Sequence, residues 1–281
     1  LELGEPRQPF TDGDGEFAIG AGPQVVGVSS YDHEPPEVES RAKVGALLDP
    51  DTERILSLRP DLVGIRAAAH AAVALVIRTL TLRAALIVTT YAVVLATAGD
   101  DSAVAAHQLA FTIWGFLAFV LDAIAIAAQA LTGRYLGAGD GHTARAVTER
   151  MIRWGALSGV ATGVLLAAAS PVLGVLFTPD PDVRALLTPV LLVAALGQPV
   201  AGVVFVLDGV LIGAGDGSYL AKAGLLVLVV YAPVVLAVAA TVTAHGLLWV
   251  WVAFAGLFMV ARAVVLLRRE RGDAWLVLGA R

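Results

Sequence analysis

The sequence predicts an all-α polytopic membrane protein with a small α/β segment at its amino-terminal side. The 281 residues are 58% hydrophobic and only 15% charged, and the mean hydropathy is +0.79. A soluble domain is far more polar than this. From residue 67 onward the apolar residues form six stretches, each long enough for the roughly 20 helical residues that a bilayer crossing requires.

Composition divides the chain into a polar part, residues 1–66, and an apolar part, residues 67–281. In the polar part, Gln24–Ser29 and Leu62–Ile65 read as short strands, and Asp51–Leu58 reads as a helix that begins on a favourable N-cap residue. Two strands and a helix bury too little surface for a stable independent domain. We therefore expect a loosely docked extension ahead of the membrane part.

Hydropathy sets the expected spans of the membrane part. Ala67–Ile77 is also apolar, and it either lengthens the first span or lies along the membrane surface. Gly155, Gly159 and Gly163 recur at every fourth position, which places them on one helix face and predicts a close helix–helix contact. The six predicted spans are Leu80–Ala98, Gln108–Leu131, Ile152–Phe177, Leu186–Ile212, Ala221–Ala239 and Leu247–Leu267.

Charge in the gaps between the spans predicts the orientation. Basic residues gather at both flanks of the set and after the second and fourth spans, whereas the other gaps carry mostly aspartates. Because basic loops stay on the cytoplasmic side, both termini are expected in the cytoplasm. The chain is expected to be a multi-pass protein of the cell (inner) membrane, with the lipid bilayer as its first partner.

Two acids interrupt the predicted spans: Asp122 in the second and Asp208 in the fourth. A carboxylate inside a membrane is costly and suits cation exchange with a water-filled cavity; alternatively, each acid caps a broken helix or bonds a neighbouring backbone. Arg83 is a candidate partner, although its head group could equally snorkel to the lipid headgroups. Gln108 and Gln129 either line a polar cavity or hold helices together. These five residues form the candidate cation- and substrate-binding set.

The two acids belong to a repeated pattern. Phe119–Asp122 and Phe205–Asp208 both read Phe-Val-Leu-Asp, and the two helices end in Gly-Ala-Gly-Asp at Gly137–Asp140 and Gly213–Asp216. With these motifs, the stretch from Arg78 to Arg281 resembles the second half of the multidrug and toxic compound extrusion (MATE) transporters, DinF-type branch. The resemblance implies antiport of H⁺ or Na⁺ against small organic, often cationic, compounds by two rocking six-helix lobes. The chain would then be half of a transporter, with an amino-terminal six-helix lobe missing.

The polar part has a resemblance of its own. The Ala-Ile-Gly-Ala-Gly turn at Ala18–Gly22, the pair Pro35-Pro36, the run Lys43–Gly45 and the helix from Asp51 resemble the early part of periplasmic binding proteins for cobalamin and iron siderophores. This leaves two alternative hypotheses: a binding module for cobalamin or iron chelates, or a non-functional fusion fragment. Because the match covers only part of one lobe, we expect a remnant without its ancestral role.

Other functional classes find no support in the sequence. There is no cysteine, which excludes disulfides and thiolate metal sites. Neither HExxH, GxSxG nor a P-loop occurs, and no basic patch suggests a nucleic-acid partner. We therefore expect no enzyme activity, no metal site and no cofactor beyond the coupling ion.

Overall fold

The computed structural model describes residues 25–28, 36–46, 49–50, 57–58, 62–242 and 244–278. The chain forms two compact units, which are described separately. The first comprises Leu1–Val73, Gly137–Asp140 and Leu278–Arg281, and the second comprises Ala74–Leu136 and Gly141–Val277.

In the first unit, short strands form two pairs. Strand β1 (Gly27–Val28) pairs in parallel with β2 (Ala42–Lys43), and β3 (Gly45–Ala46) pairs antiparallel with β4 (Asp49–Pro50). A 3₁₀-helix, η2 (Pro36–Ser40), brings Val38 against Val25 and Val28 in a three-residue buried cluster. Among the residues of this unit that the structure describes, these three valines form the buried apolar cluster, and the small core expected of this part of the chain stays a prediction.

The structure corrects one predicted strand and leaves other predictions untested. Leu62–Ile65 is not a strand but the first turn of helix α3, which runs without interruption from Leu62 to Ala96. The boundary predicted between residues 66 and 67 therefore falls inside α3. Apart from Ser57 and Leu58, the helix predicted from Asp51 lies outside the described residues, as does the turn at Ala18–Gly22.

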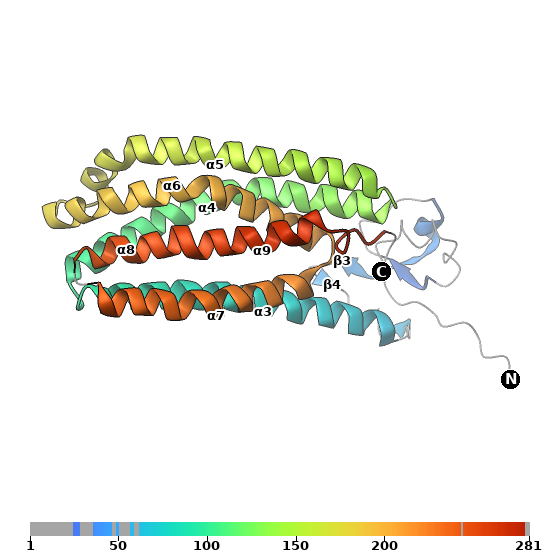
Figure 1. Ribbon diagram of the computed structural model, residues 1–281. Coiled ribbons are helices and arrows are strands. Elements are labelled where there is room, and N and C mark those ends of the chain that lie inside the picture. The colour runs from blue at the N-terminus through green and yellow to red at the C-terminus, as the bar shows by residue number, and fades with distance from the viewer. Residues whose placement is uncertain are drawn as a thin grey trace. The chain divides into compact units, whose positions relative to one another are not determined.

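All six predicted spans are helices, and all are longer than predicted. Ala67–Ile77 is part of α3, and the candidate membrane span of that helix, Ala72–Ala96, includes it from Ala72 onward. The sixth span is formed by α8, a six-residue π-helical segment η3, and α9 in succession. Besides α3, the bounds are α4 (Asp101–Gly137), α5 (Gly141–Phe177), α6 (Pro181–Gly213), α7 (Gly217–Thr241), α8 (Gly246–Val252), η3 (Ala253–Phe258) and α9 (Met259–Arg271) (Figure 1).

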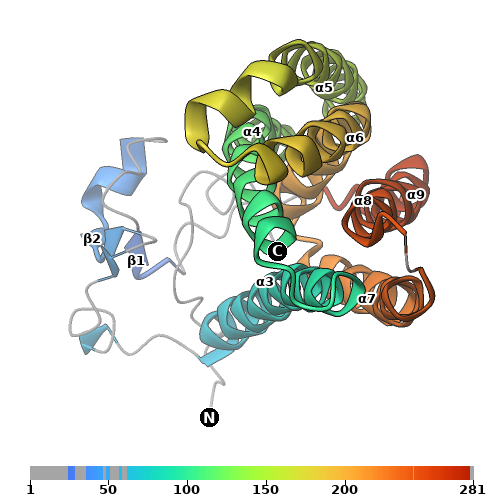
Figure 2. The ribbon, with the colours of Figure 1, turned by 90° about the vertical axis from the view of Figure 1, so that its left-hand side faces the viewer.

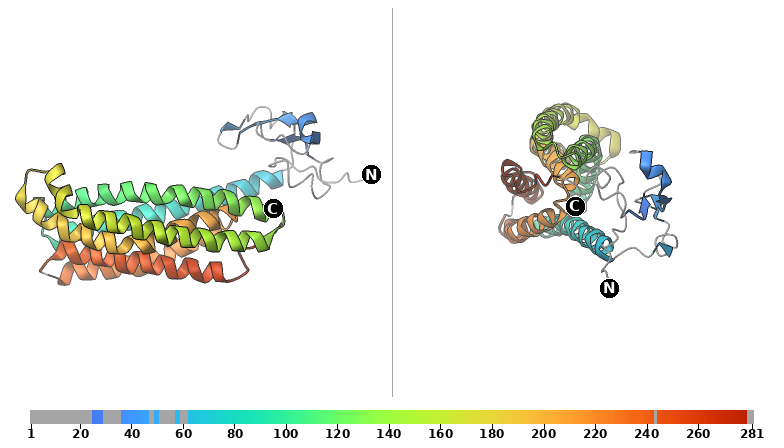
Figure 3. Two further views of the ribbon diagram at one scale, coloured as in Figure 1. Left: turned by 90° about the horizontal axis from the view of Figure 1, so that it is seen from above. Right: turned by 90° about the vertical axis from the view of Figure 1, so that its right-hand side faces the viewer.

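Seen end on, the helices of the second unit fall into groups. Helices α3 and α7 lie side by side, α5 lies against α6, and α8–α9 lies between α6 and α7 (Figure 2). Helix α4 runs obliquely: it starts beside α3 and ends beside α6 (Figures 1 and 3). Helices α3 and α4 therefore diverge from the turn that joins them, which is the feature that positions the candidate site.

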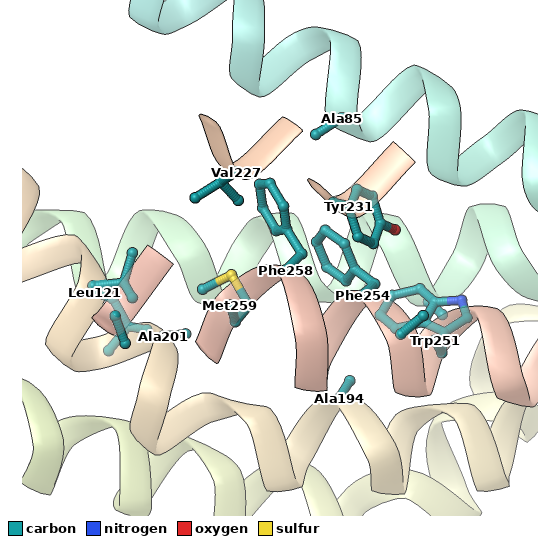
Figure 4. Close-up of a cluster of buried hydrophobic side chains, with 14 of the residues drawn as sticks. Ala85, Leu121, Ala194, Ala201, Val227, Tyr231, Trp251, Phe254, Phe258 and Met259 are labelled. Carbon is teal, nitrogen blue, oxygen red and sulfur yellow. The ribbon is translucent and has the colours of Figure 1, made fainter. Parts of the chain in front are cut away.

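The core of the second unit lies where α6, α7 and the η3 segment meet. Tyr231 of α7 and Phe258 pack at 5.1 Å between ring centroids, and Phe254 stacks on Phe258 at 5.5 Å. Trp251 closes the cluster at one end and is fully buried (Figure 4). Large aromatic side chains bury the most surface per residue, so this cluster ties α8–α9 to α7 and the neighbouring helices.

The glycine row of α5 makes the predicted close contact. Gly155, Gly159 and Gly163 are buried against α6, and a Cβ atom added at Gly155 or Gly163 would come within 2.6 Å of a carbonyl oxygen of Gly202 or Ala195. Only glycine allows two helix backbones to approach so closely. The prediction of a packing face is confirmed.

Candidate functional site

Asp208 lies five residues before the end of α6 and is buried in the bundle. Its Oδ2 atom accepts a hydrogen bond from Arg78 Nη2 of α3 at 3.0 Å and a second one from Arg262 Nη2 of α9. The side chains of Arg78 and Arg262 are 21% and 12% exposed. One carboxylate thus connects three helices that are distant in sequence.

This Asp208 network (Asp208, Arg78 and Arg262) carries a net positive charge, because two guanidiniums face one carboxylate. Asp208 Oδ1 and Arg78 Nε are buried and have no hydrogen-bond partner among the described residues. Leaving such an atom unpaired costs about 1–3 kcal/mol, so an unpaired atom commonly marks a place for a water or an ion. A small cavity beside Asp208, also lined by Gly224, has space for about one water molecule.

Arg83 is not the ion-pair partner of either acid in the part of the chain that the structure describes. Asp208 is paired with Arg78 and Arg262, and Arg83 forms no ion pair with a described residue. The apolar part of α3 runs from Ala72 to Ala96, so Arg83 lies roughly 16 Å and 20 Å from its two ends. The snorkelling alternative stays a prediction, because it depends on where the lipid headgroups lie along α3.

Arg83 instead lines a groove of ≈ 590 Å³ between α3 and α4, near the turn that joins them. Along α3 the lining residues recur at intervals of three and four, which is one face of a helix. Gln108, one of the predicted site residues, faces the same groove from α4. The residues lining this α3–α4 groove are Arg83, Leu86, Ile87, Thr90, Tyr91, Val94, Gln108, Phe111 and Thr112.

Asp122 and Gln129 lie farther along the same face of α4. With Gln108 and Thr112 they fall within a sector of about 100° around the helix axis, and the side chains of Asp122 and Gln129 are exposed. Asp122 lies roughly 31 Å from the start of α4, against roughly 17 Å for Thr112, so it is outside the groove. Its side chain has no hydrogen bond or ion pair with the described residues. The structure therefore separates the two predicted acids: one is buried and paired, the other exposed.

A buried histidine joins the groove to α8. His107 Nδ1 accepts a hydrogen bond from Trp251 Nε1 at 3.2 Å, and His107 Nε2 lies 3.1 Å from Thr90 Oγ1. Since the indole is a donor only, Nδ1 carries no proton. Thr90 donates to the Leu86 carbonyl oxygen at 3.2 Å, so His107 Nε2 donates to Thr90. His107 thus links Thr90, which lines the groove, to Trp251 of α8.

Sequence reasoning missed two members of the Asp208 network. Arg78 lies just before the predicted first span, Leu80–Ala98, and is therefore not among the candidate residues, whereas α3 includes it. Arg262 lies inside the predicted sixth span and, as an intramembrane charge, could have been identified by the same argument that selected the acids. No sequence pattern indicates that it meets Asp208, because the contact depends on how α9 packs against α6.

Comparison with known proteins settles the family. The family model MatE matches residues 80–241, more than half of the chain. The chain belongs to the MatE family. The resemblance to MATE transporters predicted from the repeated motifs is thus confirmed, and this family consists of transporters rather than enzymes. The DinF-type branch, and the resemblance of residues 1–65 to a binding protein, stay predictions.

Curated relatives agree with the assignment. Protein DETOXIFICATION 45, chloroplastic, of Arabidopsis thaliana is 30% identical over 184 residues, which are 62% of this chain and 31% of the relative. Protein DETOXIFICATION 42 of the same plant is 29% identical over 171 residues, 61% of this chain and 32% of the relative. The chain spans about a third of the length of these relatives. No solved structure matches it.

Proposed function

We propose that the chain is one six-helix lobe of a membrane efflux transporter that exchanges H⁺ or Na⁺ for small organic compounds. The family assignment supports a transporter, and the chain's coverage of about a third of its relatives supports a single lobe. A second lobe would complete the transport pathway. The proposal also places the lobe in the cell (inner) membrane with both termini in the cytoplasm, in keeping with the basic residues at that end of the helices.

The observation that carries the proposal is the Asp208 network. A buried carboxylate with one oxygen held by two arginines leaves Oδ1, which has no hydrogen-bond partner among the described residues, as the atom that accepts a proton or Na⁺, and this cation must then compete with the positive charge of Arg78 and Arg262. A cation bound at Oδ1 neutralises Asp208 and weakens its attraction for Arg78 and Arg262. Helices α3 and α9 are then less firmly held to α6, which gives the lobe a second state whose population the cation controls.

Helix α3 connects the Asp208 network with the α3–α4 groove. Arg78 and Arg83 are five residues apart, an axial rise of roughly 7.5 Å, and the groove-lining residues follow on the same helix. A shift of α3 on cation binding changes the shape of the groove, and by linkage a compound in the groove changes the cation affinity. Asp122, Gln108 and Gln129 would extend the polar path along α4.

Proteoliposomes that contain the purified chain test this proposal. Under an imposed pH or Na⁺ gradient, the accumulation of fluorescent organic compounds of both charges is compared between wild type and Asp208→Asn. Infrared difference spectra of the carboxyl C=O band then report cation exchange at Asp208 separately from flux. A gradient-dependent flux that Asp208→Asn abolishes means that the lobe works alone. An Asp208-dependent carboxyl band without flux means a half-carrier, and absence of both results contradicts the proposal.

A further inference from the structure

We infer that Asp216, which ends the second Gly-Ala-Gly-Asp motif, is a positioning residue for the proposed cation exchange. With Arg269 it fixes the carboxyl-terminal end of α9, so that release of Arg262 moves the part of α9 between that end and the π-helical segment η3. The inference rests on the proposed function and adds which part of the lobe moves. Three features carry it: a second ion pair on α9, the contacts that surround this pair, and the position of η3.

The second ion pair lies two helical turns beyond the Asp208 network. Arg269 Nε donates a hydrogen bond to Asp216 Oδ2 at 2.6 Å, and the two side chains are 26% and 14% exposed. Arg262 and Arg269 are seven residues apart, so they lie on the same face of α9 and roughly 10 Å apart along its axis. Helix α9 is therefore held at two points, one inside the bundle and one at its carboxyl-terminal end.

The carboxylate of Asp216 serves α9 rather than the helix that it precedes. Asp216 is the N-cap residue of α7, but its side chain makes no capping hydrogen bond, which is the usual use of an aspartate there. The guanidinium of Arg269 lies over the ring of Tyr219, 4.8 Å from the centroid, and donates to the Ala274 carbonyl oxygen at 3.3 Å. Tyr219 Oη donates to the Val265 carbonyl oxygen at 2.8 Å. These contacts fix the last turns of α9, and Asp216, Tyr219 and Arg269 together are called the Asp216 clamp.

Arg145 of α5 secures the chain just beyond the clamp. Its guanidinium donates to the carbonyl oxygens of Glu270 and Gly272 at 3.4 Å and 3.1 Å, and to Asp273 Oδ1 at 2.6 Å. The side chain of Asp273 is 93% exposed, and so exposed an ion pair contributes little. Trp275 is buried and donates to the Glu270 carbonyl oxygen at 2.8 Å. The backbone contacts of Arg145 and Trp275 thus hold the end of α9 in place together with the clamp.

The opposite end of α9 is joined to α8 by η3. The Met259 amide donates to the carbonyl oxygen of Phe254, five residues earlier, which is the bond of a π-helix. Such segments are rare, often occur at functional sites, and are places where helices bend. Before η3, α8 is fixed, because Trp251 is buried and donates to His107. Segment η3 is thus a joint between an anchored α8 and the beginning of α9.

The Asp208 contact lies between this joint and the clamp. In the part of the chain that the structure describes, the bond from Arg262 is the ion pair that ties the middle of α9 to α6. A cation at Asp208 weakens this bond, whereas the Asp216 clamp does not include Asp208 and stays closed. The stretch Met259–Arg268 then pivots about the clamp. Its displacement is largest beside η3 and smallest at the clamp.

Spin-label distances along the helix test the inference in the full chain in nanodiscs. The reference label is at Leu196→Cys on α6, and the second label is at Val252→Cys in α8, at Val260→Cys beside η3, or at Arg268→Cys beside the clamp. All four positions are exposed, and the chain has no cysteine of its own. Adding Asp208→Asn at constant pH should shift the Val260 distribution by at least about 1–2 Å, the size of helix shifts in switching proteins. The Val252 and Arg268 distributions should not change.

A second pair of variants tests the role of Asp216. In Asp208→Asn, the further change Asp216→Asn should shift or broaden the Arg268 distribution as well, because α9 then loses its fixed end. The matched control is Asp273→Asn, which removes another carboxylate at the same end of the helix. It leaves the two carbonyl contacts of Arg145 in place, so the Arg268 distribution should stay unchanged.

Equal shifts at Val260 and Arg268 in Asp208→Asn overturn the inference, and so does the absence of a shift at Val260. An Arg268 distribution that Asp216→Asn does not change removes the role of Asp216. Arg262→Ala breaks the same contact from the other side, and it replaces Asp208→Asn if circular dichroism shows that this variant has lost its helices. Because both variants need no cation, the result is independent of the infrared band of Asp208. That band without any movement of α9 would leave the proposed function standing and reject this inference.

Discussion

Arg78 and Arg83 are five residues apart on α3 and serve two different sites. Arg78 Nη2 bonds Asp208 Oδ2 at 3.0 Å inside the bundle, whereas Arg83 borders the open groove toward α4. Helix α3 thus carries one arginine of the buried Asp208 network and the arginine that lines the groove. The proposed coupling between the two sites depends on this arrangement, because a rigid helix transmits a change at one arginine to the other.

Replacing Asp208 by alanine should destabilise the lobe strongly. Two partly buried guanidiniums lose their counter-ion, and breaking a fully buried ion pair costs about 3–5 kcal/mol, so a loss approaching that range is expected. The free energy of unfolding in mixed detergent micelles measures the effect. Asp122→Ala is the matched control, since that acid is exposed and has no ion pair with a described residue; its change should stay within about 0.5 kcal/mol. Equal losses in the two variants would show that the Asp208 network does not stabilise the fold.

Arg78 and Asp208 should be energetically coupled in a double-mutant cycle. In Arg78→Ala, Asp208 keeps Arg262, so the loss should be smaller than in Asp208→Ala. The cycle of Arg78→Ala with Asp208→Ala should give a coupling energy of about 1–3 kcal/mol, as for residues in direct contact. Strict additivity would mean that the 3.0 Å contact has no energetic consequence. Unfolding in the same micelles provides the four free energies.

Gly159→Ala should separate α5 from α6. A Cβ atom there would clash with the carbonyl oxygen of Gln198 and with Pro199, and overpacking of this kind costs about 1–3 kcal/mol. Gly115→Ala in α4 is the control, because nothing lies within 4 Å of its added Cβ, and it should be neutral or slightly stabilising. A thermal melt followed by tryptophan fluorescence compares the two. A Gly159→Ala protein as stable as wild type would mean that the helices pack less closely than described.

Much of the fold could be predicted from the sequence, because hydropathy and small-residue spacing are local properties. All six spans are helices, and the Gly155–Gly163 face packs against α6 as predicted. The predicted start of the first span at Leu80 is wrong, because α3 begins at Leu62 and its candidate membrane span at Ala72. Charged residues end a span in hydropathy plots even where the helix continues past them.

The candidate site was predictable only in part. Asp208 stood out because a carboxylate in an apolar helix is rare, but its partners could not be assigned from spacing. The contact with Arg78 bridges 130 residues and depends on where the bundle places α3 relative to α6. Likewise, Gln108 and Arg83 meet in one groove because α4 starts beside α3 and then diverges from it. Such oblique helix directions leave no periodic signature in the sequence.

The most direct test is a distance measurement between α3 and α9 as the cation concentration changes. The chain has no cysteine, so Leu80→Cys and Val264→Cys, both at exposed positions, introduce the two spin-label sites. If cation binding at Asp208 releases α3, acid pH or Na⁺ shifts or broadens the distance distribution measured by double electron–electron resonance. Asp208→Asn should then show the shifted distribution under all conditions. A wild-type distribution that does not respond to either cation and equals that of Asp208→Asn would contradict the central claim that cation binding at Asp208 releases α3.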